Sequence, residues 1–214
     1  MRKVIAVEFT TLDGVMQAPG GTSEDTSSDF KFGGWLVPYA DDAAGEALSV
    51  TYGQPYDLLL GRRTYDIFAD YWPKVAAKSE ADGVSEGDLK FAREFDACTK
   101  YVATHSPSTL KWQHSQALGK DIVESVKKLR AEIGKVLLIV GSSDLLHTLL
   151  AHDLVDELHL HITPLILGKG KRLFDENSKP RSMKLIRSVI SSTGTLLMNY
   201  GRDGEVKTGT FGVT

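Results

Sequence analysis

One run of five apolar residues constrains the fold of this chain most strongly. The run 136–140 contains only Val, Leu and Ile, and glycines stand close to both of its ends. A strand that is apolar throughout is typical of the middle of a parallel sheet, where helices cover both faces. Helix-like segments precede and follow this run. The chain therefore favours an α/β fold built around a mostly parallel sheet.

The same alternation of strand and helix continues along the rest of the chain. We expect strands at 4–9, 56–60, 100–104 and 158–163, and a further short strand at 110–113. We expect helices at 41–54, 62–71, 86–96, 121–133 and 145–150, with Trp72 and Pro73 closing the second of them. Two last strands, near 183–192 and 195–200, are predicted to form an antiparallel hairpin.

Composition excludes several classes of protein. The chain has 214 residues, with 25 Lys+Arg against 28 Asp+Glu and a net charge of −3. This balance gives no reason to expect nucleic acid or an anionic membrane as a partner. No window approaches the roughly 20 apolar residues of a membrane span, and the first residues do not resemble a signal peptide. We expect a cytoplasmic protein with a single domain over residues 1–214.

Two turns between a strand and a helix are candidate phosphate sites. The turn 61–64 reads Gly-Arg-Arg-Thr, and the turn 141–143 reads Gly-Ser-Ser. Glycine lets the backbone approach a ligand, helix starts favour anions, and arginine matches phosphate geometry. Each turn alone fits ordinary helix capping as well. Two of them in one α/β chain favour a nucleotide, because ligands bind at the carboxyl ends of parallel strands.

The cysteine and two of the histidines allow other chemistry. Cys98 is the single cysteine, which excludes an intrachain disulfide and a Cys-based zinc cluster. It is a candidate nucleophile, but an idle thiol is expected because no activating base lies near it in sequence. His159 and His161 share one face of a predicted strand. Since no third ligand is evident, we expect a hydrogen-bonded or interface pair and no metal.

A long polar segment follows the first predicted strand. Residues 17–34 are rich in Gly, Ser, Thr and Asp, and loops of this length are often functional. Aromatic side chains in or beside it, Phe30, Phe32 and Trp35, are able either to stack on a planar ligand or to anchor the loop. Because lids of this composition close over active sites, we expect a mobile lid.

Several stretches resemble a known family. These are the segment Gly-Ser-Ser-Asp-Leu at 141–145, Asp-Glu-Leu at 156–158, and Pro-Leu-Ile-Leu-Gly-Lys-Gly-Lys-Arg-Leu-Phe at 164–174. They look like the reductase domain of riboflavin biosynthesis, the RibD C-terminal domain, which belongs to the dihydrofolate-reductase-like superfamily. Leu-Asp-Gly at 12–14, Gly-Arg-Arg-Thr-Tyr at 61–65, Lys-Tyr-Val at 100–102 and the segment 194–200 fit the same order. The resemblance covers nearly the whole chain.

The resemblance implies a dihydrofolate-reductase-like fold that binds NADPH, and it gives each candidate residue a place. The adenosine 2′-phosphate end would meet Arg62, Arg63 and Thr64, and the adenine ribose would lie near Thr104 and His105. Gly61 is a further cofactor-binding candidate. The pyrophosphate would be held by Gly141, Ser142, Ser143 and Asp144. The nicotinamide would lie near Asp13 and Gly14. The family usually has a glycine pair where this chain has Gly141 and Ser142.

The resemblance implies an NADPH-dependent reductase of a small planar heterocycle. A pyrimidine- or pterin-like acceptor is expected, as in the reduction of 5-amino-6-(5-phosphoribosylamino)uracil. Candidate proton donors are Asp13 and Glu46, with Asp42 as a further carboxylate; Asp13 equally fits a turn-forming role before glycine. The alternative is a non-catalytic nucleotide- or flavin-binding protein that kept the fold. A homodimer is expected, because a C-terminal hairpin exposes a strand edge.

Overall fold

The computed structural model describes residues 1–176 and 178–212 and is organised around one eight-stranded sheet. The strand order is β4-β3-β2-β5-β1-β6-β8-β7. The strands are β1 (Val4–Thr11), β2 (Tyr56–Gly61), β3 (Lys100–Ala103), β4 (Ser115–Ala117), β5 (Val136–Val140), β6 (Glu157–Thr163), β7 (Ser182–Ile190) and β8 (Leu196–Gly204). Pairing is parallel from β4 to β6 and antiparallel from β6 through β8 to β7. This confirms the predicted α/β class and its C-terminal hairpin.

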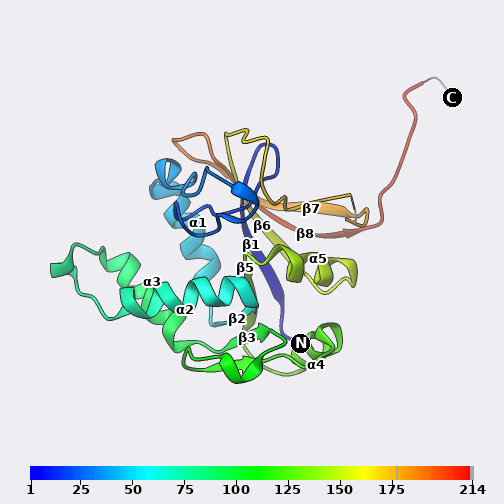
Figure 1. Ribbon diagram of the computed structural model, residues 1–214. Coiled ribbons are helices and arrows are strands. Elements are labelled where there is room, and N and C mark those ends of the chain that lie inside the picture. Colours follow the sequence, from blue (N-terminus) through cyan, green and yellow to red (C-terminus); the bar gives the residue numbers. More distant parts are fainter. Residues whose placement is uncertain (177, 213–214) are drawn as a thin grey trace.

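Helices cover both faces of the sheet (Figure 1). One face carries α1 (Asp42–Tyr52), α2 (Arg62–Ala76) and α3 (Glu86–Ala97), and the other carries α4 (Ile122–Ala131) and α5 (Ser143–Ala151). Alternate residues of β5 belong to the two cores. Leu138 packs with the aromatic core under α1–α3, and Leu137 and Ile139 pack with the aliphatic core under α4 and α5. Burial on both faces explains why this strand is apolar throughout.

Helix α2 runs further than the sequence suggests. It was expected to close at Trp72 and Pro73, but it continues through Pro73 to Ala76. The last turn is held by packing, since Val75 is buried and the Trp72 ring meets Phe91 and Phe95 edge-on at centroid distances of 5.3 and 5.1 Å. Tertiary contacts therefore override the helix-breaking tendency of proline here.

The short strand expected at 110–113 is wrong. A 3-10 turn, Pro107–Thr109, is followed by irregular chain, and the edge strand is Ser115–Ala117 instead. The apolar character of this segment comes from Trp112, which is buried against the sheet and donates from Nε1 to Asp96 Oδ1 at 2.7 Å. One buried tryptophan therefore gave this irregular segment the apolar character that is typical of a strand.

The segment after β1 is folded against itself. Val15, Ala18, Phe30 and Trp35 form a small buried cluster, and Trp35 Nε1 donates to the Gln17 carbonyl at 2.8 Å. Of the two roles open to these aromatic side chains, Phe30 and Trp35 have the anchoring one. The expectation that they cover an acceptor is wrong for these two residues, because their burial leaves them no face for a ligand.

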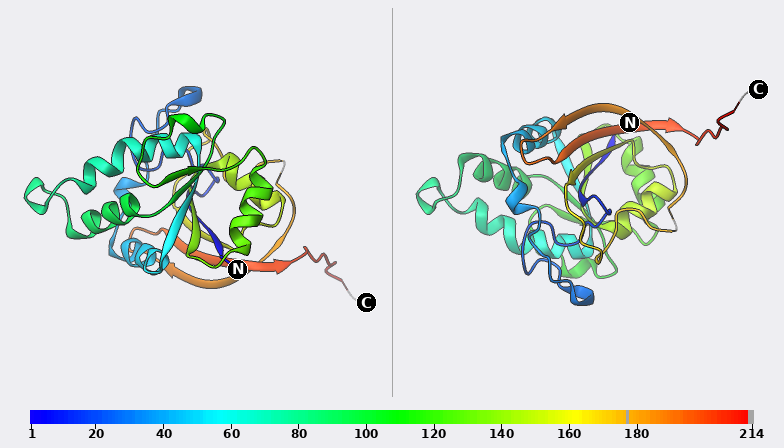
Figure 2. Two further views of the ribbon diagram at one scale, coloured as in Figure 1. Left: turned by 90° about the horizontal axis from the view of Figure 1, so that it is seen from below. Right: turned by 90° about the horizontal axis from the view of Figure 1, so that it is seen from above.

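The hairpin β7–β8 forms one side of the molecule, and the chain beyond β8 leads away from the body (Figure 2). Strand β7 is the free edge of the sheet, and Leu185, Ile186 and Ile190 on it are exposed. Within residues 1–176 and 178–212, no helix has the length and apolar character needed to cross a membrane.

Candidate active site

A cleft of about 1600 Å³ opens where the parallel strands end. Strands β2, β5 and β1 are neighbours, so Gly61, Val140 and the end of β1 meet at one edge of the sheet. The turns 61–64 and 141–145 form one wall, and parts of the segment 16–25 also line the cleft. The cleft continues between α1, α2 and α3. The topology therefore brings together the two turns that the sequence marked as phosphate sites.

The side chain of Ser142 joins the two turns. Its Oγ accepts from the Gly61 backbone N–H at 2.8 Å and donates to Thr64 Oγ1 at 2.7 Å. A Cβ atom on Gly61 would lie 2.9 Å from Ser142 Cβ and Oγ, so only glycine fits there. The backbone at Gly141 and Ser142 is left-handed, with φ values of +68° and +70°. The two turns consequently form one continuous surface.

The start of α5 leaves backbone donors for a ligand. Ser142 is the residue before the helix, but its hydroxyl is engaged with the other turn and does not cap α5. The first N–H groups of a helix have no partner within the helix, and they attract anions. All four predicted pyrophosphate residues of this turn line the cleft, namely Gly141, Ser142, Ser143 and Asp144.

The arginines of the other turn are both engaged. Arg62 Nε donates to Asp66 at 2.9 Å, and its Nη1 reaches Thr109 Oγ1 at 2.5 Å and Thr104 Oγ1 at 3.3 Å. Thr104 therefore lies beside Arg62, although it does not line the cleft. His105 lines the cleft and is exposed. These side chains form a polar end of the cleft.

Asp25 was not among the predicted site residues. It accepts from Arg63 Nη2 at 2.5 Å and from Lys171 Nζ at 2.8 Å. Burial opposes its ionisation, but hydrogen bonds from Lys171 and Ser27 outweigh burial and lower the pKa of Asp25 to about 2. Asp25 therefore ties the segment after β1 to the start of α2 and to the loop after β6. A sequence signal existed only in the Gly-Lys-Gly-Lys block, which supplies Lys171.

Asp13 lies outside the cleft lining. It accepts from Thr11 Oγ1 at 2.5 Å and from the Gly168 and Leu167 N–H groups at 2.8 and 3.2 Å. Burial raises its pKa, but these hydrogen bonds prevail and leave the pKa below its usual range. An ionised carboxylate has no proton to give. The geometry thus argues against Asp13 as the acid and fits the turn-forming alternative; Gly14 beside it has φ +78° and also lies outside the lining.

The two carboxylates predicted on α1 are also outside the cleft. Glu46 and Asp42 are exposed, whereas Gly45 between them lines the cleft. Neither side chain is thereby brought to the wall formed by the two turns.

A carboxylic acid that sequence reasoning missed does line the cleft. Glu8 on β1 is 1% exposed and receives a hydrogen bond from the Gly141 backbone. Its Oε1 has no hydrogen-bond partner among the described residues. Burial is the main cause that raises the pKa of Glu8 well above its usual range. The signal for Glu8 in the sequence was a single acidic residue within the apolar run of the first predicted strand.

The far part of the cleft is aromatic. Tyr52, Phe68, Trp72 and Phe91 line it, with edge-on contacts such as Tyr52–Phe91 at 4.7 Å. Tyr56 Oη and Trp72 Nε1 are buried without a hydrogen-bond partner in the described part of the chain. This part of the cleft is therefore mainly apolar, with two buried donors that lack a partner among the described residues.

The predicted special residues outside this wall have structural contacts. Cys98 is buried, and burial raises the pKa of its thiol to about 11, which keeps it protonated. His159 contacts Thr51 Oγ1 at 2.8 Å and Glu157 Oε2 at 3.0 Å, so it is the hydrogen-bonded histidine of the pair. His161 meets the Phe9 ring edge-on at 4.9 Å. Among the described residues no group of three or more His, Cys, Asp or Glu is placed to hold a metal ion.

The sheet order and the antiparallel C-terminal hairpin give this α/β protein a fold like that of dihydrofolate reductase. Among proteins of this fold, the chain belongs to the RibD C-terminal domain family, whose model matches residues 2–197.

Known proteins are similar to this chain over nearly its whole length. The uncharacterized protein YyaP of Bacillus subtilis (strain 168) is 26% identical over 203 residues, which cover 95% of this chain and 96% of that protein. A putative riboflavin biosynthesis protein from Shewanella sp. PV-4 has a TM-score of 0.57 and 17% identity, over 95% of this chain and 99% of the other. Dihydrofolate reductase from Enterococcus faecalis, complexed with NADP(H) and RAB-propyl, has a TM-score of 0.56 and 14% identity, over 94% and 96%.

Proposed function

We propose that this protein is an NADPH-dependent reductase of a small planar heterocycle. The observation that carries the proposal is the single wall made by the turns 61–64 and 141–145, with Ser142 bonded to both Gly61 and Thr64. A dinucleotide needs adjacent sites for a pyrophosphate and for a nucleoside phosphate, and this wall offers both. The NADP(H) complex of the Enterococcus enzyme, which has the same fold, supports this choice of cofactor.

The donor set of the wall fits the phosphates of NADPH. The free N–H groups at the start of α5 and the Thr64 hydroxyl would hold the pyrophosphate. Arg62, with Arg63 and His105 nearby, would bind the 2′-phosphate, for which guanidinium groups are well matched. The bound nicotinamide supplies the hydride. The chain supplies orientation, exclusion of water and a proton.

The aromatic part of the cleft suits the acceptor. Phe68, Trp72 and Phe91 line this part and are not fully buried, so they present flat apolar surfaces on which a planar ring gains dispersion and burial energy. The unpartnered donors Tyr56 Oη and Trp72 Nε1 would bond to ring oxygen or nitrogen atoms. A pyrimidine- or pterin-like ring combines these properties, which supports the class of acceptor that the family suggests.

The test has two stages. Titration with NADPH, followed by nicotinamide fluorescence, measures binding, and loss of absorbance at the dihydronicotinamide band then measures turnover with 7,8-dihydrobiopterin, 5,6-diaminouracil and menadione. We expect saturable binding of NADPH and oxidation with at least one acceptor. Binding without oxidation would favour the non-catalytic nucleotide-binding alternative. Absence of NADPH binding would refute the proposal.

A further inference from the structure

Glu8 is a buried acid with very few neighbouring groups that would stabilise its ionised form. It follows the stretch of β1 that pairs with β5, where Val7 is aligned with Val140, so its side chain lies beside the Gly141 turn. Across β6 its aligned neighbour is the apolar Leu160. One backbone N–H, that of Gly141, bonds to it, and Oε1 is unpartnered among the described residues. A buried carboxyl with this few donors is expected to hold its proton.

The ionisable groups around Glu8 do not change this conclusion. Tyr52 on α1 is the ionisable side chain whose electrostatics Glu8 affects, and burial together with Glu8 raises the pKa of Tyr52, so it stays neutral. Two cations that line the cleft, Arg63 and Lys171, are both bonded to Asp25. No ion pair to Glu8 is formed by the residues the structure describes.

We infer that Glu8 is the catalytic acid of this site, holding a proton on its carboxyl group beside the Gly141 turn and donating it to the heteroatom of the acceptor. The inference rests on the proposed function and deepens it. As hydride adds to the carbon of a C=N or C=O bond, the π electrons move to the nitrogen or oxygen atom. The O–H bond of Glu8 breaks, and its proton goes to that atom. Glu8 is left as a carboxylate and takes up a proton from water before the next turnover.

Two other acids near the cleft are weaker candidates. Asp25 has two cationic partners and a pKa of about 2, so it has no proton to donate at neutral pH. Glu24 is partly buried and its pKa is raised, chiefly by burial, but its Oε2 accepts from the Gly20 and Gly21 N–H groups at 2.7 and 3.1 Å. These bonds hold Glu24 in the loop wall and favour its charged form.

The first test measures the proton without any turnover. Carbon-13 NMR of protein labelled at the glutamate side-chain carboxyl carbon follows each carboxyl as pH changes, and the signal missing from Glu8→Gln identifies Glu8. We expect this signal to titrate well above the ordinary range of a glutamate carboxyl, because burial raises the pKa of Glu8. A midpoint in the ordinary range near pH 4 would overturn the inference, whatever the activity.

The second test measures donation. The acceptor is whichever of the three compounds above the wild-type protein reduces fastest. Glu8→Gln keeps the shape and the acceptor for the Gly141 N–H, so NADPH affinity should stay within twofold, while kcat falls by about 10²- to 10⁴-fold. The wild-type kcat should fall as pH rises through the pKa of Glu8, and the residual rate of Glu8→Gln should lack that dependence. Glu8→Asp should restore part of the pH-dependent rate.

The remaining outcomes decide against either the donor role of Glu8 or the proposed function. Unchanged kcat in Glu8→Gln, or a comparable loss in Glu24→Gln together with loss of the pH dependence there, would remove Glu8 as the donor. The control Glu132→Gln, far from the cleft, should leave kcat unchanged. A wild-type protein that oxidises no NADPH with any acceptor would refute the proposed function and the donor role with it. The NMR titration would still decide whether Glu8 is a neutral buried acid.

Discussion

Replacing Asp25 by Asn should destabilise the protein in a way that depends on pH. The Asp25 side chain is 10% exposed and bonds to both Arg63 and Lys171. Lowering its pKa from 3.8 to about 2 corresponds to about 2 kcal/mol of stability. Arg63 and Lys171 are 57% and 40% exposed, so solvent screens part of this interaction. We therefore expect Asp25→Asn to lose about 1–2 kcal/mol at pH 7.

The sign of the pH dependence follows from the lowered pKa. The unfolded chain binds a proton at Asp25 more readily than the folded chain does, so the stabilisation is complete well above pH 4 and is lost as pH falls toward 2. The difference between wild type and Asp25→Asn should fall to about half near pH 3 and be small at pH 2. Added salt should reduce it, because its cationic partners are partly exposed.

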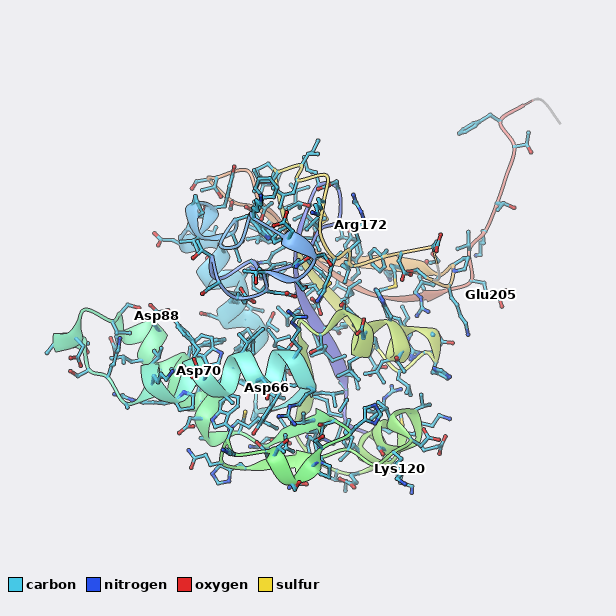
Figure 3. The ribbon with its side chains drawn as sticks, in the orientation of Figure 1. Asp66, Asp70, Asp88, Lys120, Arg172 and Glu205 are labelled. Carbon is cyan, nitrogen blue, oxygen red and sulfur yellow. The ribbon has the colours of Figure 1, made fainter. Side chains whose placement is uncertain are left out.

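Urea unfolding, followed by tryptophan fluorescence at pH 7, 5, 3 and 2, measures this difference. The matched control is Asp70→Asn, which breaks the Lys74–Asp70 pair at 2.6 Å, whose side chains are 68% and 78% exposed. Asp70 lies on the outer side of α2 (Figure 3), and its loss should change the unfolding free energy little. A difference for Asp25→Asn that is the same at pH 7 and pH 2 would refute the electrostatic argument and leave loop packing as the cause.

Four further outcomes follow from the site and the sheet. Arg62→Ala should weaken NADPH by about 10- to 100-fold, since a charged hydrogen bond contributes roughly 1.5–3 kcal/mol, and should leave NADH nearly unchanged in the same fluorescence titration; equal losses would contradict the 2′-phosphate assignment. Gly141→Val should abolish NADPH binding in a protein that keeps its circular dichroism spectrum, because a branched side chain is strained at φ +68° and fills the cradle; normal affinity would exclude that cradle. Glu8→Gln should gain stability over wild type as pH rises from 5 to 8, by up to about 1.4 kcal/mol per pH unit, because folded Glu8 retains a proton that the unfolded chain releases; thermal melts at each pH decide this. Light scattering should give about twice the chain mass of 23.4 kDa if β7 pairs with a second copy, and a monomer mass would reject the dimer.

Much of the fold could be predicted because local pattern and tertiary structure agree in it. Strand β5 is apolar in sequence because it is buried on both faces, and the hairpin β7–β8 joins at Gly194, whose φ of +83° suits a turn glycine. The wrong predictions concern segments whose structure is determined by the packing of one large side chain. Trp72 holds the end of α2 beyond a proline, and Trp112 buries an irregular stretch. Neither effect leaves a periodic pattern in the sequence, because each depends on contacts with another segment of the chain.

The same distinction applies to the candidate site, where residues with a local sequence signal could be predicted and residues positioned by distant contacts could not. The turns 61–64 and 141–143 were recognisable because glycine at a strand end has a local cause in the backbone. Asp25 and Glu8 were not, since the role of each comes from residues that the fold brings to it: Lys171 lies 146 positions from Asp25, and the Gly141 turn comes from another strand. Asp13 shows the converse case. A recognisable motif placed it at the site, yet its three strong donors hold it in a turn.

The contact between Ser142 and Gly61 also limits how this protein can diverge. A side chain at position 61 and a side chain at position 142 would occupy the same space, 2.9 Å apart, so the chain tolerates one of them at a time. An alanine at 61 becomes sterically possible only after position 142 has lost its side chain, and that first step removes the hydroxyl bonded to Gly61 and Thr64. The two positions are therefore linked in evolution, and the order in which they change is fixed by this overlap.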